Sequence, residues 1–401
     1  MVRVAVTGLG PVSSIGVGVS AFADSLRSGR SGISRITSFD TSGFPFVKAG
    51  EVHGFRPGEH LSRLDPSRWG RSSLFAATAA RLAAADGGLD PDRIDAGRAH
   101  AVIGTTSGES QVLEALTAQI LADGFAGQDP TLLAQLPANR LAHAVSEELG
   151  LAGESLTLAT ACSASNYAIG YGYDLLVAGE ADVVFAGGAD AVCRWAHAGF
   201  FRLGALTEHA CAPFDRDRSG ILTGEGGAVL MLETFEHARA RGARIYAELL
   251  GYGRNCDAHH PVAPHTPSIA DCIRLAHRNA GVKPEDVDYI CAHGTGTPAN
   301  DLVEGAAILE VFGPEPPPVS SIKSMIGHTM GAASGFGAIA GVLAIDRGFL
   351  PPTVNWEHPD EGLPGLDPVP NVARDATVRV VQNDGFAFGG NNAIVMLGAV
   401  A

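Results

Sequence analysis

The sequence predicts an α/β protein built as two interlocked halves. Strand-like apolar runs alternate with amphipathic helical runs along the whole chain, a pattern typical of α/β architecture. The 401 residues, 46% of them hydrophobic, exceed the usual size of one domain and can bury a large core. No low-complexity linker or charge run divides the chain, so we expect both halves to form one globular unit.

The first half is expected to begin with a strand at residues 2–7 and a turn at residues 8–14. That turn resembles a dinucleotide-binding loop, but Pro11 interrupts it and Ser13 stands where a third glycine is needed. We therefore expect a structural turn. The remaining elements expected here are helices at 74–85 and 111–123, strands at 99–104, 156–161 and 181–186, and a helix after Cys162.

The first half ends with a glycine turn that leads into a buried strand at 224–233, followed by a charged helix at 235–241. The second half continues the same alternation after about residue 242. The elements expected next are strands at 245–250 and 287–292, a helix at 268–280, and a proline-rich surface loop at 314–318 before a strand at Val319. The expected division of the chain is therefore 1–242 and 243–401.

Charge and cysteine content exclude several classes of protein. The formal net charge of −15 disfavours nucleic acid and anionic membrane as partners. No apolar run reaches the roughly 20 residues of a membrane span, and no signal-like segment precedes the first strand, so we expect a soluble, cytoplasmic protein. The six cysteines lack paired spacing, which argues against disulfides and a zinc site, and we expect no metal.

Cys162 is the first candidate for chemistry. An alternating apolar run ends in small residues at Cys162, and a helical pattern follows. A thiol at a strand-to-helix turn lies near the positive end of the helix, which predicts a lowered pKa for its thiolate. On this signal alone a buried structural cysteine is the more common alternative.

Three loops in the second half, at 292–298, 320–333 and 385–392, favour the reactive alternative. Each follows a short apolar strand and consists almost wholly of small and reactive residues. Ligand sites of α/β proteins form where loops gather at strand ends, so these loops and the cysteine predict one pocket. The candidate residues in them are His293, Lys323, His328, Phe386 and Phe388.

Two alternatives remain open at this point. Lys323 has the pattern of a surface lysine, although its apolar neighbours favour burial, and the two phenylalanines have the pattern of core residues. Their glycine-rich loop instead favours a hinged aromatic gate.

A cysteine with two histidines indicates a particular reaction. A protease-like hydrolase needs only one histidine as base. Two neutral histidines can both donate hydrogen bonds to one thioester carbonyl and stabilise the enolate formed when a malonyl group loses carbon dioxide. That carbanion can attack an acyl group held on the cysteine, which is a decarboxylative Claisen condensation.

At these residues the chain closely resembles the β-ketoacyl-acyl-carrier-protein synthases, specifically the elongating type II ketosynthases of fatty acid and polyketide systems. The resemblance covers essentially the whole chain, in family order and spacing. It rests on the motifs at 4–10, 160–163, 292–295, 323–328 and 385–390. It implies the thiolase fold, in which two similar halves form a five-layer αβαβα sandwich with the active site between them.

The resemblance also implies roles for the candidate residues. Cys162 would be the acylated nucleophile, His293 and His328 would polarise the malonyl thioester, and Lys323 would support His328. The backbone N–H groups of Cys162 and Phe388 would form the oxyanion hole beside a gate of Phe386 and Phe388. The resemblance further implies that Thr295 and Thr297 bind the phosphopantetheine arm, and that Arg63, Arg68 and Arg71 dock the acidic carrier protein. Solvated arginines at a helix start are the alternative for that cluster.

Three departures from the family pattern stand out. Gly337 occupies the position of a customary glutamate that pairs with the lysine, so another carboxylate such as Glu304 would have to replace it. Ala387 replaces a gate glycine, which predicts a modestly stiffer loop. Asn391 replaces a customary threonine.

The leading hypothesis is an active ketosynthase that uses no cofactor of its own. The alternative is a non-catalytic, chain-length-determining scaffold, which the retained Cys162, His293 and His328 disfavour. A thiolase would need a second cysteine late in the chain, and none follows Cys291. The resemblance implies acyl carrier protein as partner and a dimer, either of two identical chains or with a chain-length-factor-like homologue. The altered gate and missing glutamate favour specialised metabolism and the heterodimer.

Overall fold

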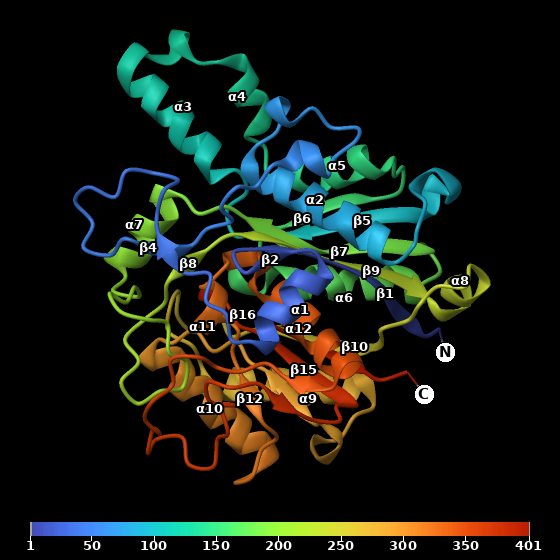
Figure 1. The fold of residues 1–401 in the computed structure, drawn as a ribbon, viewed down its shortest axis with the longest axis vertical. Helices are drawn as coiled ribbons and strands as arrows, with labels where there is room; N and C mark the ends of the chain where they lie inside the picture. Colours follow the sequence, from blue (N-terminus) through green and yellow to red (C-terminus); the bar gives the residue numbers. More distant parts are fainter. Residues whose placement is uncertain (1, 401) are drawn as a thin grey trace.

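The computed structural model describes residues 2–400 and has five layers (Figure 1). Helices α2 (Arg71–Asp86) and α5 (Arg140–Leu149) cover the outer face of the first-half strands. Helices α6 (Ala164–Val177) and α12 (Ala333–Arg347) form the middle layer, and α9 (Thr266–Ala280) and α10 (Pro298–Phe312) cover the second-half strands. The expected αβαβα sandwich is confirmed.

The strands of each half follow the same order and orientation. In the first half, β1 and β9 are antiparallel, β9 and β7 are antiparallel, and β7, β5 and β6 are parallel. In the second half the series β10, β16, β15, β11, β12 repeats this pattern, and β1 pairs with β10 to join the two series. The strands are β1 (Val4–Ser13), β5 (Ala99–Gly104), β6 (Ser155–Leu158), β7 (Val183–Asp190), β9 (Gly226–Thr234), β10 (Ala247–Cys256), β11 (Tyr289–Cys291), β12 (Val319–Ser320), β15 (Val380–Gly385) and β16 (Asn391–Gly398).

The two halves are therefore topologically similar. The expected boundary at residues 242 and 243 lies between α8 (Phe235–Ala240) and β10, and as a domain boundary it stays a prediction. The other helices are α1 (Val19–Arg27), α3 (Ser110–Asp123), α4 (Pro130–Gln135), α7 (Arg194–Arg202) and α11 (Lys323–Ile326). Short strands are β2 (Gly16–Val17), β3 (Ser34–Arg35), β4 (Lys48–Gly50), β8 (Thr223–Gly224), β13 (Phe349–Leu350) and β14 (Arg374–Asp375).

The turn expected at residues 8–14 was wrong, because β1 continues through Ser13. Its glycines serve packing instead. A Cβ on Gly10 would lie 1.8 Å from the carbonyl oxygen of Ala79, and one on Gly8 would lie 2.1 Å from that of Ala83. Helix α2 thus rests directly on the backbone of β1, an approach that only residues without side chains allow.

The middle layer carries the active-site loops. Every residue of α12 from Ala333 to Ala344 is buried, as expected for a helix covered by a sheet on each side. Its small residues let the two sheets approach closely. Within residues 2–400, no helix combines the length and the apolar character that crossing a membrane requires.

Candidate active site

Cys162 lies on a tight turn between β6 and α6, as the sequence predicts. The strand ends at Leu158, and a single 3-10 turn at Ala161–Ser163 leads into the helix. Ala161 has a φ of +52°, a left-handed conformation that is strained for a residue with a side chain. The Ser163 hydroxyl donates hydrogen bonds to the Thr160 and Asn391 carbonyl oxygens at 3.0 and 2.8 Å, which tie the turn to the gate loop.

The thiol of Cys162 does not have the lowered pKa that its position predicted. Burial raises the pKa of Cys162 to about 11, because the interior disfavours the thiolate. The charge of Lys323 and the backbone N–H groups of Phe388 and Cys162 lower the pKa, but by less than burial raises it. Those two N–H groups thus face the sulfur, as an oxyanion hole requires.

One pocket brings the predicted loops together. Its lining includes Cys162, His293, His328, Phe386 and Phe388, and it extends past Thr295 and Thr297. The rings of His293 and His328 are 5.6 Å apart and nearly perpendicular, at 82°. Two histidines and the thiol therefore share a single cavity.

Both histidines are neutral. Burial and the nearby charge of Lys323 lower the pKa of His328 to about 3, and the same causes lower the pKa of His293 well below its usual value. Nδ1 of His328 accepts the Met330 N–H at 3.0 Å, so the ring proton is on Nε2. A neutral ring with a fixed N–H is a hydrogen-bond donor that keeps its proton.

Lys323 and Glu304 hold one peptide group from opposite sides. Lys323 Nζ donates to the carbonyl oxygen of His293, whereas Glu304 accepts the Gly294 N–H of the same peptide and the His293 N–H, each at 2.7 Å. Lys323 was expected to support His328, but its direct contact is with His293. Burial lowers the pKa of Lys323 and the Glu304 carboxylate raises it. Burial raises the pKa of Glu304 and of Asp384 and the charge of Lys323 in turn lowers it, so two buried carboxyl groups lie near this lysine.

The missing glutamate has a steric cause. A Cβ on Gly337 would lie 2.3 Å from Oδ1 of Asn383. Asn383 is held there by its Nδ2, which donates to Asn166 Oδ1 at 2.8 Å and to the Ser334 carbonyl oxygen at 2.9 Å. The Asn166–Asn383 pair, which links α6 to β15, fills the space that a side chain at position 337 needs.

The two gate phenylalanines occupy different places. Phe386 is only 3% exposed and packs against the His293 ring, 5.8 Å away. Phe388 is 38% exposed, and its ring lies 6.1 Å from that of Phe200. The following Gly389 has a φ of +80°, which favours glycine. Both phenylalanines line the pocket, Phe386 buried and Phe388 partly exposed, and a gate formed by them stays a prediction.

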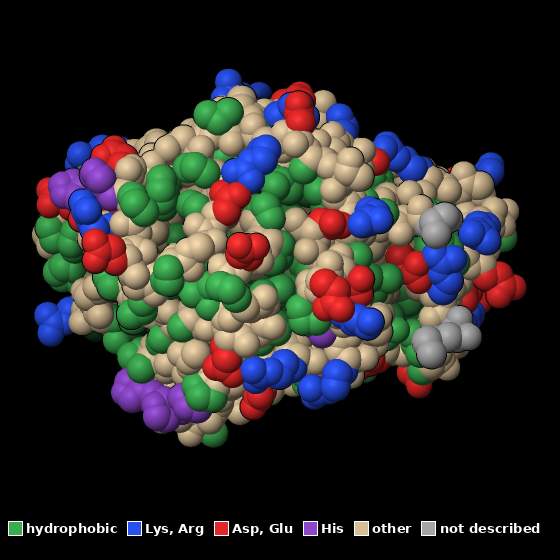
Figure 2. Space-filling model, turned by 90° about the horizontal axis from the view of Figure 1, so that it is seen from below, with side chains coloured by type: hydrophobic (Ala, Val, Ile, Leu, Met, Phe, Trp, Pro, Cys, Tyr) green, Lys and Arg blue, Asp and Glu red, His purple; other side chains and the backbone are tan. Residues whose placement is uncertain are grey.

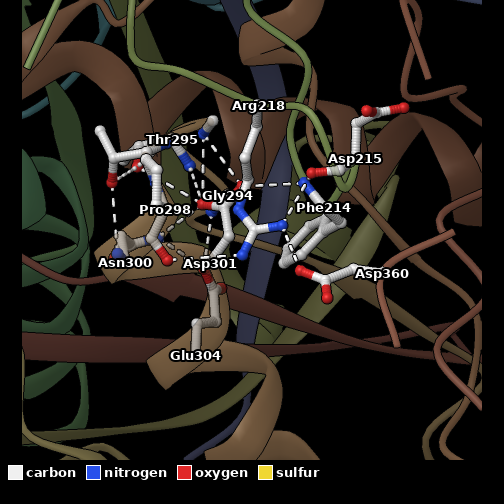
Figure 3. Close-up of polar contacts among 12 residues, drawn as sticks. Phe214, Asp215, Arg218, Gly294, Thr295, Pro298, Asn300, Asp301, Glu304 and Asp360 are labelled. Atoms are coloured by element: carbon white, nitrogen blue, oxygen red, sulfur yellow. Dashed lines mark hydrogen bonds and ion pairs between the residues drawn. The ribbon is translucent and has the colours of Figure 1, made fainter. Parts of the chain in front are cut away.

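The Thr295–Thr297 segment rests on a buried charge network that sequence reasoning missed (Figure 3). Asp301 accepts the N–H groups of Thr295 at 3.0 Å and Phe214 at 2.8 Å. Arg218 Nε lies 3.8 Å from Asp301 Oδ2, and Arg218 Nη1 donates a hydrogen bond to Asp360 Oδ2 at 2.5 Å. The two threonine hydroxyls are 2.9 Å apart and line the pocket. No local sequence motif indicated Arg218 or Asp301, because their partners come from distant segments.

The three arginines expected to dock a partner lie in different settings. Arg71 forms an ion pair at 2.5 Å with the buried carboxylate of Glu225. Arg63 pairs with the exposed Asp92, and Arg68 is exposed beside the start of α2. Arg71 is thus tied to the interior, and docking by Arg63, Arg68 and Arg71 stays a prediction.

Comparison with known proteins shows the family of the chain. The model of the Beta-ketoacyl synthase, N-terminal domain matches residues 1–238, and that of the Beta-ketoacyl synthase, C-terminal domain matches residues 246–357. The chain is 37% identical to a 3-oxoacyl-[acyl-carrier-protein] synthase 2 of Coxiella burnetii over 99% of both chains.

Solved structures agree as well. The structure described as "The ishigamide ketosynthase/chain length factor" is 50% identical, with a TM-score of 0.98, over 100% of this chain and 99% of that one. A type II polyketide ketosynthase in complex with its acyl carrier protein, AntDE:AntF, is 31% identical with a TM-score of 0.91, over 100% and 99%. The chain belongs to the β-ketoacyl synthase family, whose members are acyltransferase-type condensing enzymes.

Proposed function

We propose that the protein is an active ketosynthase that condenses an acyl chain on Cys162 with a malonyl group carried by acyl carrier protein. One observation carries the proposal. A buried thiol shares its pocket with two neutral histidine donors and faces two backbone N–H groups. A hydrolase also uses an oxyanion hole, but it needs only one histidine, as a base, and not a second neutral histidine as a donor.

The first half-reaction loads Cys162. The sulfur attacks the thioester carbonyl of an acyl group on the phosphopantetheine arm, and the N–H groups of Cys162 and Phe388 stabilise the oxyanion. The bond between the acyl carbon and the arm's sulfur then breaks. The arm leaves as a thiol with the proton that Cys162 gives up, so one thioester replaces another.

The second half-reaction forms the carbon–carbon bond. The malonyl thioester carbonyl accepts hydrogen bonds from His328 Nε2 and from the His293 ring while the bond to the carboxylate breaks and carbon dioxide leaves. The resulting enolate attacks the acyl carbon on Cys162. The sulfur leaves as a thiolate and takes up a proton readily, because its pKa is about 11.

The substrate arm would enter along Thr295 and Thr297, which line the same pocket as the histidines. We propose that Arg63 and Arg68 contact the acidic carrier protein. On the face seen in Figure 2, acidic and basic side chains are interspersed, so that face offers no strong single-sign field.

We propose a homologous second subunit against the open edge of the first half. Strand β6 ends the sheet path and has a partner on one side only. The hairpin of α3 and α4 projects from the same half (Figure 1), and it exposes 83% of Leu121 and 79% of Phe125. Open strand edges and large exposed apolar side chains are typical of subunit interfaces. A chain-length-factor-like partner is our choice, since the 50% identical structure is described as containing one.

The experiment that tests the proposal is acylation of Cys162. Incubation with acyl carrier protein bearing a saturated acyl chain should add the mass of one acyl group, as measured on the intact protein. The adduct should vanish in Cys162→Ala and persist in Cys256→Ala, which removes an exposed thiol as a control. A wild-type protein without the adduct, alone and with the second subunit, would instead support the scaffold function.

A further inference from the structure

The turn after His328 is held in an unfavourable backbone conformation. Met330 has a φ of +53°, in the left-handed region that is strained for a residue with a side chain. Its N–H donates to Nδ1 of His328 at 3.0 Å, so this conformation fixes which ring nitrogen carries the proton. A strained conformation persists only where the surrounding contacts enforce it. The contacts that hold this turn therefore control the donor that His328 presents to the pocket.

Those contacts converge on the next residue, Gly331. Its N–H donates to Oδ2 of Asp190 at 2.6 Å, and its carbonyl oxygen accepts the Ser165 hydroxyl at 2.6 Å. A Cβ on Gly331 would lie 2.6 Å from Cα of Thr105 and 2.7 Å from Oδ2 of Asp190, so only glycine allows this approach. We call these two hydrogen bonds the Gly331 clamp.

The Gly331 clamp joins the histidine turn to the half of the chain that carries the thiol. Ser165 lies in the first turn of α6, the helix that follows the Cys162 turn, and Asp190 is the last residue of β7. Both polar backbone groups of Gly331 are therefore held by the first half. The clamp sets where the second-half turn of His328 lies relative to Cys162.

Asp190 is a buried carboxylate whose hydrogen-bond partners are all neutral. It is 1% exposed, and it also accepts the Thr105 hydroxyl at 2.7 Å and the Thr106 N–H at 2.8 Å. Burial raises the pKa of Asp190 to about 6 against the effect of these bonds, so the group is ionised at pH 7. Burial raises the pKa of Cys162, and the charge of Asp190 raises it further while that of Lys323 lowers it.

Asp190 is not one of the described residues that line the pocket, so it acts on the reaction only through other groups. We propose that Asp190 is a positioning residue for the condensation step, which holds Gly331, and with it the Met330 turn and the ring of His328, in place beside Cys162. The inference rests on the proposed function, because it concerns the same thiol and the same histidine.

The two half-reactions depend differently on the clamp. Acyl transfer to Cys162 uses the sulfur and the two backbone N–H groups that face it, and it does not use His328. Decarboxylation of the malonyl group needs the Nε2–H of His328 at the thioester carbonyl. Loss of the clamp should therefore slow condensation and spare acylation.

Three substitutions separate the hydrogen bond of Asp190 from its charge. Asp190→Ala removes both. Asp190→Asn removes the charge but keeps the clamp, because its Oδ1 can accept the Gly331 and Thr106 N–H groups while its Nδ2 donates to the Thr105 hydroxyl. Ser165→Ala removes the donor to the Gly331 carbonyl oxygen and leaves the charge of Asp190 unchanged.

Asp86→Ala is the matched control. Asp86 is the last residue of α2 and is half-buried, and its Oδ2 accepts the Leu9 N–H at 2.9 Å. It resembles Asp190 in accepting a backbone N–H, but it is not among the described residues of the pocket lining. Its removal measures the general effect of losing such a carboxylate.

Intact-protein mass spectrometry follows the two half-reactions separately. The rate of acyl adduct formation with acyl-carrier protein measures acylation, and the rate at which purified acyl-enzyme loses the adduct to malonyl-carrier protein measures condensation. Asp190→Ala and Ser165→Ala should each slow condensation roughly ten-fold and acylation less than about two-fold. Asp190→Asn should keep condensation within about three-fold of wild type, and Asp86→Ala should change neither rate.

Three results would overturn the inference. Equal slowing of both half-reactions in Asp190→Ala and Ser165→Ala would leave Asp190 a residue of the folded framework only. Unchanged condensation in both would exclude the clamp, and equal losses in Asp190→Asn and Asp190→Ala would assign the effect to charge. Ser165→Ala alone decides if Asp190→Ala does not fold. A wild-type protein that forms no acyl adduct would contradict the proposed function instead, so the two failures are distinguishable.

Discussion

At the scale of single residues, the reactive groups are held in their neutral forms by burial. Cys162 is 5% exposed, and His293 and His328 are each 3% exposed. Transfer from water disfavours a thiolate and an imidazolium alike, so it raises the pKa of the first and lowers the pKa of the others. Neutral donors and a neutral thiol suit a reaction in which negative charge develops only on the substrate and the departing sulfur.

The raised pKa of Cys162 predicts how fast the free enzyme is alkylated. With a pKa of about 11, the thiolate fraction at pH 7 is on the order of one in ten thousand. Because the thiolate is the nucleophile, alkylation of Cys162 by iodoacetamide should accelerate about ten-fold per pH unit between pH 7 and pH 9. Peptide mass mapping of Cys162 in the Cys256→Ala background measures this rate. A plateau below pH 8 would show a lowered pKa and contradict the account.

The sequence predicted which residues share the site, but it did not predict their burial or their protonation states. Cys162, His293 and His328 each follow a strand, and strand ends converge, so their meeting could be predicted. Depth of burial depends on the whole surrounding fold, which no local pattern encodes. The contact of Lys323 with the His293 carbonyl, rather than with His328, likewise depends on how α11 packs.

At the scale of elements, glycines let neighbouring helices and strands pack more closely than residues with side chains would allow. Gly337 lets Asn383 bridge α12 and α6, just as Gly8 and Gly10 let α2 rest on β1. A strand with two glycines was mistaken for a turn, because glycine is common in both and only tertiary contact distinguishes them.

The packing of Asn383 predicts the cost of a side chain at position 337. Gly337→Ala should lower the free energy of unfolding by ~1–3 kcal/mol, since the new Cβ forces Asn383 to move. Chemical denaturation measures the difference. Gly58→Ala, whose Cβ meets nothing within 4 Å, is the control. The cost should shrink in an Asn383→Ser background, and an equal cost in both backgrounds would count against this explanation.

At the scale of the whole molecule, two equivalent halves each contribute part of one site. The first half supplies the thiol on the turn after β6, and the second supplies the histidines, lysine and gate from loops that follow β11, β12 and β15. The alternation of strands and helices predicted this architecture. The projecting α3–α4 hairpin was not predicted, because its helical pattern does not reveal where the helices point.

The most direct test of the account is condensation itself. The protein, alone and with its homologous second subunit, is incubated with acyl-carrier protein and malonyl-carrier protein, and the mass of the carrier protein is measured. We predict a 3-oxoacyl-carrier protein two carbons longer than the starting acyl chain, with release of carbon dioxide, and no such product from Cys162→Ala. Equal product from wild type and Cys162→Ala, or none from wild type under either condition, would contradict the claim that this pocket catalyses the condensation.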